Sequence, residues 1–191
     1  MRALPDTVIL LIFLALASLG VWGNGFVRDD LLFFRAADCD LSPAAVSELF
    51  KQCYFHEAGE IFYYRPLSRL FYRVENLFFQ GDSMGYHATA LVLYACFLCA
   101  LNSVLKPWIP GRFARFTGLL WIGLHPLTHS YWVYMTGIVD TLPLLLTCLA
   151  ILGARTGHGL GIVFSLVSCT LAVFSKEVGI FSYPIVAWEL W

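Results

Sequence analysis

A few charged side chains stand at the ends of long apolar stretches, and they are the residues most able to do chemistry here. Asp29 and Asp30 directly follow the first apolar stretch. Two adjacent carboxylates repel each other, so one of them either holds its proton more tightly or shares a cation. Solvated charge at the end of a helix is the alternative interpretation.

Three more candidates stand beside later apolar stretches. Asp140 lies at the entry of one of them. A carboxylate is costly there, so its presence indicates a functional role. Lys176 and Glu177 precede the last apolar stretch and form either a neutralising pair at a membrane surface or part of the same site. If the apolar stretches alternate across a membrane, all these charges face one side.

Arg65 and the histidines have two readings each. Arg65 either binds an anion or pairs with a surface carboxylate such as Glu60 or Asp82. His125 precedes Pro126, and His129 follows four residues later, a spacing that suits a metal. A proline bends a helix, which favours a structural kink instead. We expect His87, with its neighbour Tyr86, in an aromatic belt at the membrane surface.

The composition indicates that the protein is surrounded by lipid and not only by water. Of the 191 residues 59% are hydrophobic and 13% are charged, whereas soluble domains carry about 25% charged residues. Lipid must therefore cover much of the surface. The net charge of -1 gives no basic footprint for nucleic acid, which we exclude as a partner.

The charge-free stretches predict an all-α, polytopic membrane helix bundle. A transmembrane helix needs about 20 apolar residues, and continuous rather than alternating apolar runs favour helices over a barrel. We expect about six spans, at residues 7–24, 86–105, 116–135, 137–154, 157–175 and 177–191. A cleaved signal peptide is the alternative for the first.

Residues 25–85 form a long extramembrane loop that is rich in acids and aromatics. We expect two amphipathic helices in the plane of the membrane surface. The first is capped by Asp40 or Ser42 and runs from Pro43 toward Gln52. The second begins at Pro66, with an apolar stripe and, elsewhere on its wheel, charged residues. The stripe is Leu67, Leu70, Phe71 and Val74, and the charges are Arg69, Arg73 and Glu75.

Orientation and redox state follow from the flanking residues. The basic residues of the short connections fall on one side, which should be cytoplasmic; they are Arg2, Lys106, Arg112, Arg115 and Arg155. The loop then faces the lumen of the endoplasmic reticulum or the periplasm outside a bacterial inner membrane. There Cys39 and Cys53 either form a disulfide or remain two half-buried thiols.

Six short fragments follow one another along the chain. They are Phe26-Val27-Arg28-Asp29-Asp30, Tyr64-Arg65-Pro66-Leu67, Gly85-Tyr86-His87, His125-Pro126-Leu127, Gly137-Ile138-Val139-Asp140 and Lys176-Glu177-Val178-Gly179. Their order and spacing resemble one known family, the GT-C membrane glycosyltransferases. The resemblance is strongest to the branch of O-mannosyltransferases that carry tetratricopeptide repeats.

The resemblance also has departures. Ile138 replaces an arginine of the family pattern, and Ser130 stands where a glutamate is usual, so two ionic partners are missing. No tetratricopeptide repeat is visible. We expect residues 1–191 to correspond to one membrane domain, the N-terminal part of such an enzyme.

The resemblance implies transfer of a sugar, with inversion, from a polyprenyl-phosphate donor to a hydroxyl of a protein or glycan acceptor. Asp30 or Asp29 would be the base, because a hydroxyl needs a carboxylate to accept its proton. Lys176 and Arg65 would hold the departing phosphate. Glu177 and His125 are further candidates for substrate binding.

Asp140 has three possible roles under this resemblance. It positions the acceptor, orients Lys176, or completes a metal site with Asp29 and Asp30. Carboxylate ligands suit Mg²⁺ or Mn²⁺, although the sequence requires no cofactor.

Two other functional classes stay open. A non-catalytic membrane module would bind lipid or assemble with a partner chain, and the missing ionic partners favour it. A transporter or channel would carry charges near the middle of its spans, and only Asp140 comes close to that.

Overall fold

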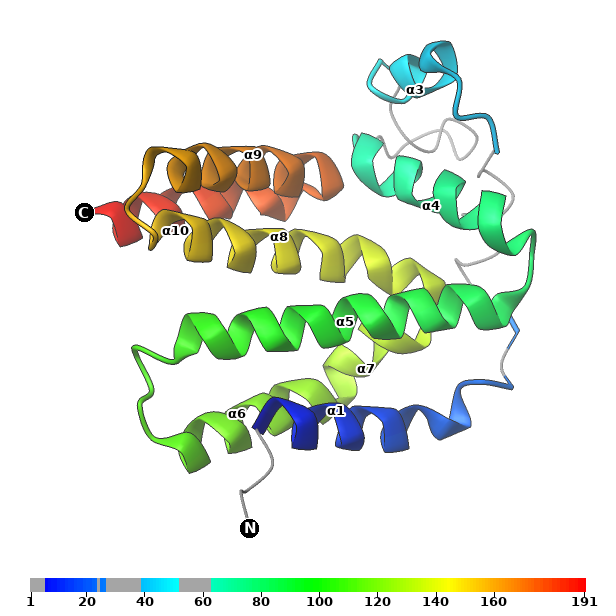
Figure 1. Ribbon diagram of the computed structural model, residues 1–191. Helices are drawn as coiled ribbons and strands as arrows, with labels where there is room; N and C mark the ends of the chain where they lie inside the picture. Colours follow the sequence, from blue (N-terminus) through cyan, green and yellow to red (C-terminus); the bar gives the residue numbers. More distant parts are fainter. Residues whose placement is uncertain (1–5, 24, 27–38, 52–62) are drawn as a thin grey trace.

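The computed structural model describes residues 6–23, 25–26, 39–51 and 63–191, and these form an all-α structure (Figure 1). Its described part contains nine α-helices. They are α1 (Asp6–Ala17), α3 (Pro43–Leu49), α4 (Pro66–Phe79), α5 (Ser83–Leu105), α6 (Arg112–Leu124), α7 (Pro126–Val133), α8 (Ile138–Ala154), α9 (Gly159–Ser175) and α10 (Ser182–Leu190). Three short 3-10 turns are η1 (Ser18–Gly20), η2 (Met135–Gly137) and η3 (Glu177–Phe181).

Two helices, α5 and α8, form the centre of the bundle. They pack against each other, with α1, α6 and α7 on one side and α9 and α10 on the other (Figure 1). The connections from α5 to α6 and from α8 to α9 lie at one end of the bundle, whereas α3 and α4 lie at the opposite end. Helices α3 and α4 of the polar loop thus lie away from the connections at 106–111 and 155–158, and the orientation in a membrane stays a prediction.

Within the described residues, two helical segments are long and apolar enough to cross a membrane. They are Ser83–Leu105 and Met135–Ala154, the latter made of η2 and α8. The predicted span 116–135 is divided into α6 and α7, because Pro126 has no N–H and His125 before it is extended at φ -66° and ψ 137°. The six-span arrangement stays a prediction.

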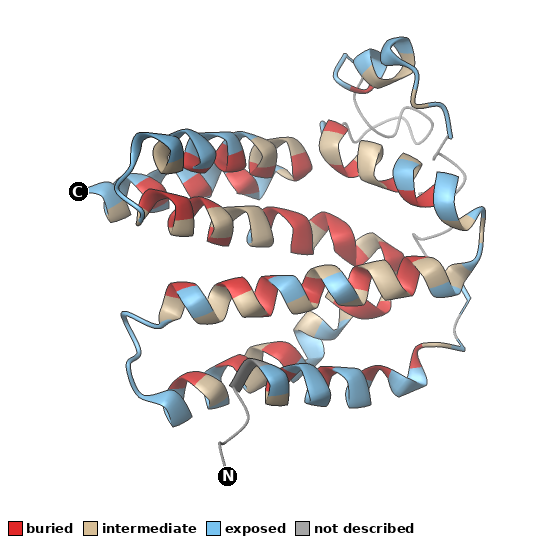
Figure 2. Ribbon diagram, viewed as in Figure 1, coloured by how far each residue is buried: buried red, intermediate tan, exposed pale blue. Residues whose placement is uncertain are grey.

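Many large apolar side chains point outward. Figure 2 shows exposed stretches along α1, α6 and α9. They include Leu16, Trp121, Leu160 and Phe164. Soluble monomers rarely expose contiguous apolar patches of this kind, so the surface of the bundle agrees with its composition in calling for lipid.

The predicted helix at Pro43 is present as α3. The Ser42 Oγ accepts a hydrogen bond from the Ala45 N–H at 3.3 Å, and Asp40 Oδ1 accepts one from the Ser42 N–H at 2.8 Å. The helix ends at Leu49, short of the expected Gln52.

The second predicted helix, α4, begins at Pro66 as expected, and its buried face carries polar side chains together with Tyr72. Ser68, Glu75 and Asn76 are buried, whereas Leu77 and Phe78 are exposed. Glu75 thus lies off the predicted apolar stripe but is packed against the protein. An apolar stripe normally faces the core, but a helix lying on a membrane surface turns it toward lipid, and its polar face is then left for the bundle.

Candidate functional site

An ion pair joins the start of α4 to the end of α9. Arg65 Nε donates to Glu177 Oε1 at 3.0 Å and to Oε2 at 3.3 Å, and Nη2 donates to Oε2 at 2.8 Å. The two residues are 112 positions apart in the chain. Arg65 is thus paired with a carboxylate, which is Glu177 and not the expected Asp82; Glu60 lies outside the described residues.

Local structure fixes Arg65 in place. It immediately precedes Pro66, whose ring starts α4. The guanidinium lies over the Tyr63 ring, 4.3 Å from its centroid, an arrangement that favours a cation over an aromatic face. The Ser68 hydroxyl donates to the Ser175 carbonyl at 2.8 Å, which ties the first turn of α4 to the last turn of α9.

The neighbouring ion pair joins Lys176 to Asp140. Lys176 Nζ donates to Asp140 Oδ1, so of the roles expected for Asp140 the structure agrees with orienting Lys176. Lys176 is extended, at φ -160° and ψ 150°, and successive side chains of extended backbone point in opposite directions. Lys176 therefore contacts α8 while Glu177 contacts Arg65. Of the two interpretations of this pair, mutual neutralisation is not what the structure shows.

Two glycines bring these segments together. A Cβ at Gly137 would lie 2.5 Å from the carbonyl oxygens of Ser130 and Tyr131, and one at Gly179 would collide with the Ala172 carbonyl. Gly137 sets the approach of α7 to the start of α8, where Asp140 lies, and Gly179 holds η3 against α9. The role of these glycines could not be read from the sequence.

Further motif residues meet beneath α4. Buried Tyr86 packs with Met135, Ile138 and Val139. The Phe26 ring lies edge-on to Tyr86, with centroids 5.4 Å apart. Asp29 and Asp30 lie outside the described residues, and their proposed role as base stays a prediction.

Cys39, which follows Asp29 and Asp30 in the sequence, also contacts α4. Asn76 Nδ2 donates to Cys39 Sγ at 3.3 Å, and the Tyr86 hydroxyl donates to Asn76 Oδ1 at 2.9 Å. Cys53 lies outside the described residues, so its disulfide with Cys39 also stays a prediction.

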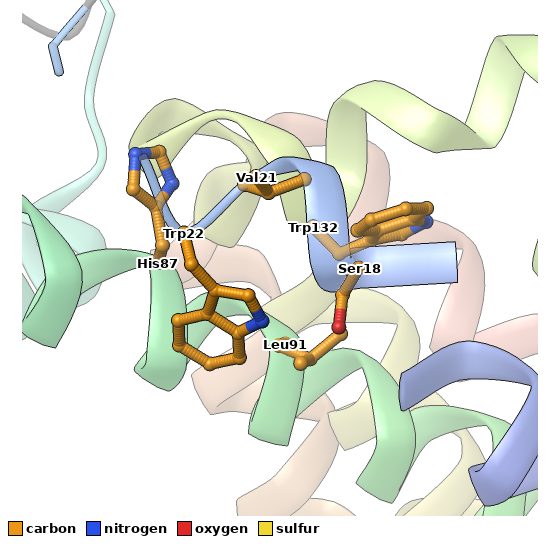
Figure 3. Close-up of a pocket in the computed structure, with 6 residues that line it drawn as sticks. All are labelled: Ser18, Val21, Trp22, His87, Leu91 and Trp132. Atoms are coloured by element: carbon orange, nitrogen blue, oxygen red, sulfur yellow. The ribbon is translucent and has the colours of Figure 1, made fainter. Parts of the chain in front are cut away.

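His87 lies in a small pocket at the start of α5, not in a surface belt as expected. The pocket is lined by Ser18, Val21, Trp22, His87, Leu91 and Trp132 (Figure 3). His87 is 2% exposed and Tyr86 is fully buried. Neither ring nitrogen of His87 has a hydrogen-bond partner among the described residues. The expectation was wrong because helix α4 and turn η1 cover this end of α5.

Glu75 is a buried acid that sequence reasoning missed. It is 3% exposed, and neither carboxylate oxygen has a hydrogen-bond partner among the described residues. The nearby Thr89 hydroxyl donates to the Gly85 carbonyl at 3.0 Å instead. Burial raises the pKa of Glu75 from 4.5 to about 9, because removing water disfavours the charged form. Glu75 is therefore protonated at neutral pH.

His125 has a structural position in the break between α6 and α7. Its Nδ1 accepts a hydrogen bond from the Leu127 N–H at 3.1 Å, and its ring lies 5.3 Å from that of Trp121. These contacts do not join it to Arg65, Asp140, Lys176 or Glu177. The structure thus favours the kink over substrate binding.

Among the described residues no three His, Cys, Asp or Glu side chains gather as metal ligands. The possible Mg²⁺ or Mn²⁺ set includes Asp29 and Asp30, which are outside that part of the chain, so the metal site stays a prediction. Comparison of the chain with protein-family models, curated proteins and solved structures finds no match.

Proposed function

We propose that the chain is the catalytic part of a GT-C type membrane glycosyltransferase. It would move a sugar, with inversion, from a polyprenyl-phosphate donor to a hydroxyl acceptor. The active face would be the end of the bundle that carries α3 and α4, on the lumenal side of the endoplasmic reticulum or the periplasmic side of a bacterial inner membrane. Six spans would anchor it, with α9 and α10 among them.

The observation that carries this proposal is the meeting of motif fragments that are distant in sequence. Ion pairs connect the fragment at Arg65 with that at Glu177, and the fragment at Lys176 with that at Asp140. Aromatic packing brings Phe26 to Tyr86. Five of the six fragments are thereby linked through described residues, and the fragment at His125 is the exception.

The chemistry assigns a role to each group. Asp30 or Asp29 accepts the proton of the attacking hydroxyl. As the bond to the sugar breaks, charge develops on the departing phosphate, and Arg65 and Lys176 stabilise it. Asp140 orients Lys176 through their ion pair.

One observation favours the second candidate, a non-catalytic lipid-binding module. Arg65 and Lys176 are each neutralised by a carboxylate, which leaves no net positive charge for a phosphate. Ile138, at the position of the family arginine, is fully buried and adds none.

A transfer assay separates the two candidates. The full chain is reconstituted in proteoliposomes with polyprenyl-phosphate-linked mannose and a peptide acceptor, and the anomer formed is identified by NMR. We expect Asp30→Asn or Asp29→Asn to abolish transfer while membrane insertion is unchanged.

Asp82→Asn is the matched control for this assay. Asp82 is a carboxylate of the same loop that caps α5 by accepting the Met84 N–H at 3.2 Å, and asparagine caps equally well. If both Asp29 and Asp30 variants keep full activity, the base assignment is wrong. If the wild type transfers no sugar, the lipid-binding module is favoured.

A further inference from the structure

The two partners of the ion pair between Arg65 and Glu177 differ in how far their side chains are buried and supported. The Arg65 side chain is 13% exposed and that of Glu177 is 50% exposed. Tyr63 supports the guanidinium from one face, and the hydrogen bond from Ser68 to Ser175 fixes the turn that carries it. Gly179 fixes the backbone beside Glu177, but half of its side chain is in contact with solvent. Glu177 is therefore the more exposed and less constrained partner.

The two partners also differ in what could replace them. A guanidinium presents parallel N–H groups that bind two oxygens of a carboxylate or of a phosphate in the same geometry. The Glu177 oxygens accept from Arg65 Nε and Nη2, which are the donors that a phosphate would use. Glu177 and a phosphate thus compete for the same atoms of Arg65.

Displacing Glu177 costs little. A solvent-accessible ion pair contributes at most about 1 kcal/mol, and the released carboxylate is already half hydrated. A phosphate monoester, such as the departing polyprenyl phosphate, carries more charge than a carboxylate and so gains more from the same donors. A carboxylate ligand, such as a fatty acid, gains nothing over Glu177.

We propose that Glu177 is a built-in competitor that occupies the donor atoms of Arg65 and leaves them when the phosphate group of a lipid-linked ligand binds. The inference rests on the proposed function, because it takes Arg65 as part of the phosphate site. It adds a selection rule, namely that phosphate-headed lipids displace Glu177 whereas carboxylate-headed lipids do not.

The test measures binding to the full chain in nanodiscs by titration. The probes are undecaprenyl phosphate, inorganic phosphate and oleate. The variants are Glu177→Gln, Arg65→Ala and the double variant. The matched control is Glu189→Gln, which removes an equal charge from a similar pair: Glu189 accepts from Arg155 at 2.7 and 2.8 Å, and the two side chains are 14% and 20% exposed. That pair joins the far ends of α8 and α10, away from α4 (Figure 1).

We expect Glu177→Gln to tighten binding of undecaprenyl phosphate about three- to fivefold, which corresponds to removing a competing ion pair of that strength. Arg65→Ala should lose this binding, the double variant should match Arg65→Ala, and Glu189→Gln should match the wild type. Oleate should bind only when Glu177 is replaced. An equal gain in affinity for inorganic phosphate would show that the phosphate group alone displaces Glu177. A gain for undecaprenyl phosphate only would show that the polyprenyl tail is needed to bring the phosphate to Arg65.

Unchanged binding in Glu177→Gln, with binding lost in Arg65→Ala, would overturn the competitor and leave the phosphate site intact. An equal gain in Glu189→Gln would overturn it too, because total charge would then explain the effect. If Arg65→Ala binds undecaprenyl phosphate as well as the wild type, the phosphate site of the proposed function fails as well.

Discussion

Glu75 belongs to α4 and Glu177 contacts Arg65 at the start of α4, and the two acids differ in protonation: Glu75 is neutral and Glu177 is ionised. Glu177 lies near the surface and is ionised against Arg65. Glu75 lies on the buried face of α4, where no described residue donates a hydrogen bond to its oxygens, and burial raises its pKa to about 9. A carboxyl without a cation or donor takes up a proton instead of remaining charged.

Charged and neutral polar groups lie in different places at this end of the bundle. All four members of the two ion pairs lie at the end of the bundle with some access to solvent, with side chains between 13% and 50% exposed. The buried side of α4 carries groups without charge, among them protonated Glu75. The four charges of the two ion pairs thus lie where a ligand could reach them, whereas buried Arg115 is hydrogen-bonded to Asn102 and to the Ile109 carbonyl.

The largest effect is expected from testing the state of Glu75 with Glu75→Gln. The folded pKa of Glu75 is raised above the unfolded value, so its contribution to wild-type stability is fully present below pH 4.5 and is lost as pH rises through about 9. The variant lacks this loss. Its advantage should grow with pH by up to about 1.4 kcal/mol per unit, measured as unfolding in detergent at a series of pH values. Parallel curves would show that Glu75 is not the buried acid described here.

A second, smaller effect concerns the fixed backbone beside Glu177. Gly179→Ala places a Cβ against the Ala172 carbonyl, and overpacking of this kind typically costs about 1 to 3 kcal/mol. Thermal unfolding of the detergent-solubilised protein measures the loss. Gly118→Ala is the control, because its Cβ would meet nothing within 4 Å. Equal melting temperatures for the two variants would mean that η3 can move away from α9.

The smallest effect is expected for Glu177→Gln on stability. Half of the side chain is already exposed, so losing the ion pair should lower the free energy of unfolding by less than about 1 kcal/mol. The same unfolding assay measures this, with no pH dependence like that of Glu75. A loss of several kcal/mol would make the pair structural and would remove the contrast between the two acids.

Local chemistry allowed part of this structure to be predicted from sequence. The start of α3 follows from Pro43 behind a capping Ser42, and the start of α4 follows from Pro66. The length of α5 follows from its charge-free run. The break at His125 follows from the missing N–H of Pro126. Each of these depends on neighbours within a few positions.

The rest depends on long-range contacts. A helical wheel separates the faces of α4 but does not say which one meets the bundle, so the burial of Glu75 was missed. The pairing of Arg65 with Glu177 spans 112 positions, and nearer acids were equally plausible from charge alone. His87 is buried because segments from elsewhere in the chain cover it. Arg65, Asp140, Lys176 and Glu177 are joined by ion pairs whose pairing the sequence did not specify, and the function of these residues stays a prediction.

The inverted face of α4 has a consequence for depth. Its outward side chains, among them Leu77 and Phe78, would enter the acyl layer, while hydrogen bonds at Ser68 and Asn76 hold the helix to the bundle. The depth of α4 in the bilayer would then fix the depth of Arg65, which directly precedes its first turn. The height of this guanidinium relative to the lipid headgroups would be set by the bilayer as much as by the protein. Membrane thickness would thereby be part of the geometry of the proposed phosphate site.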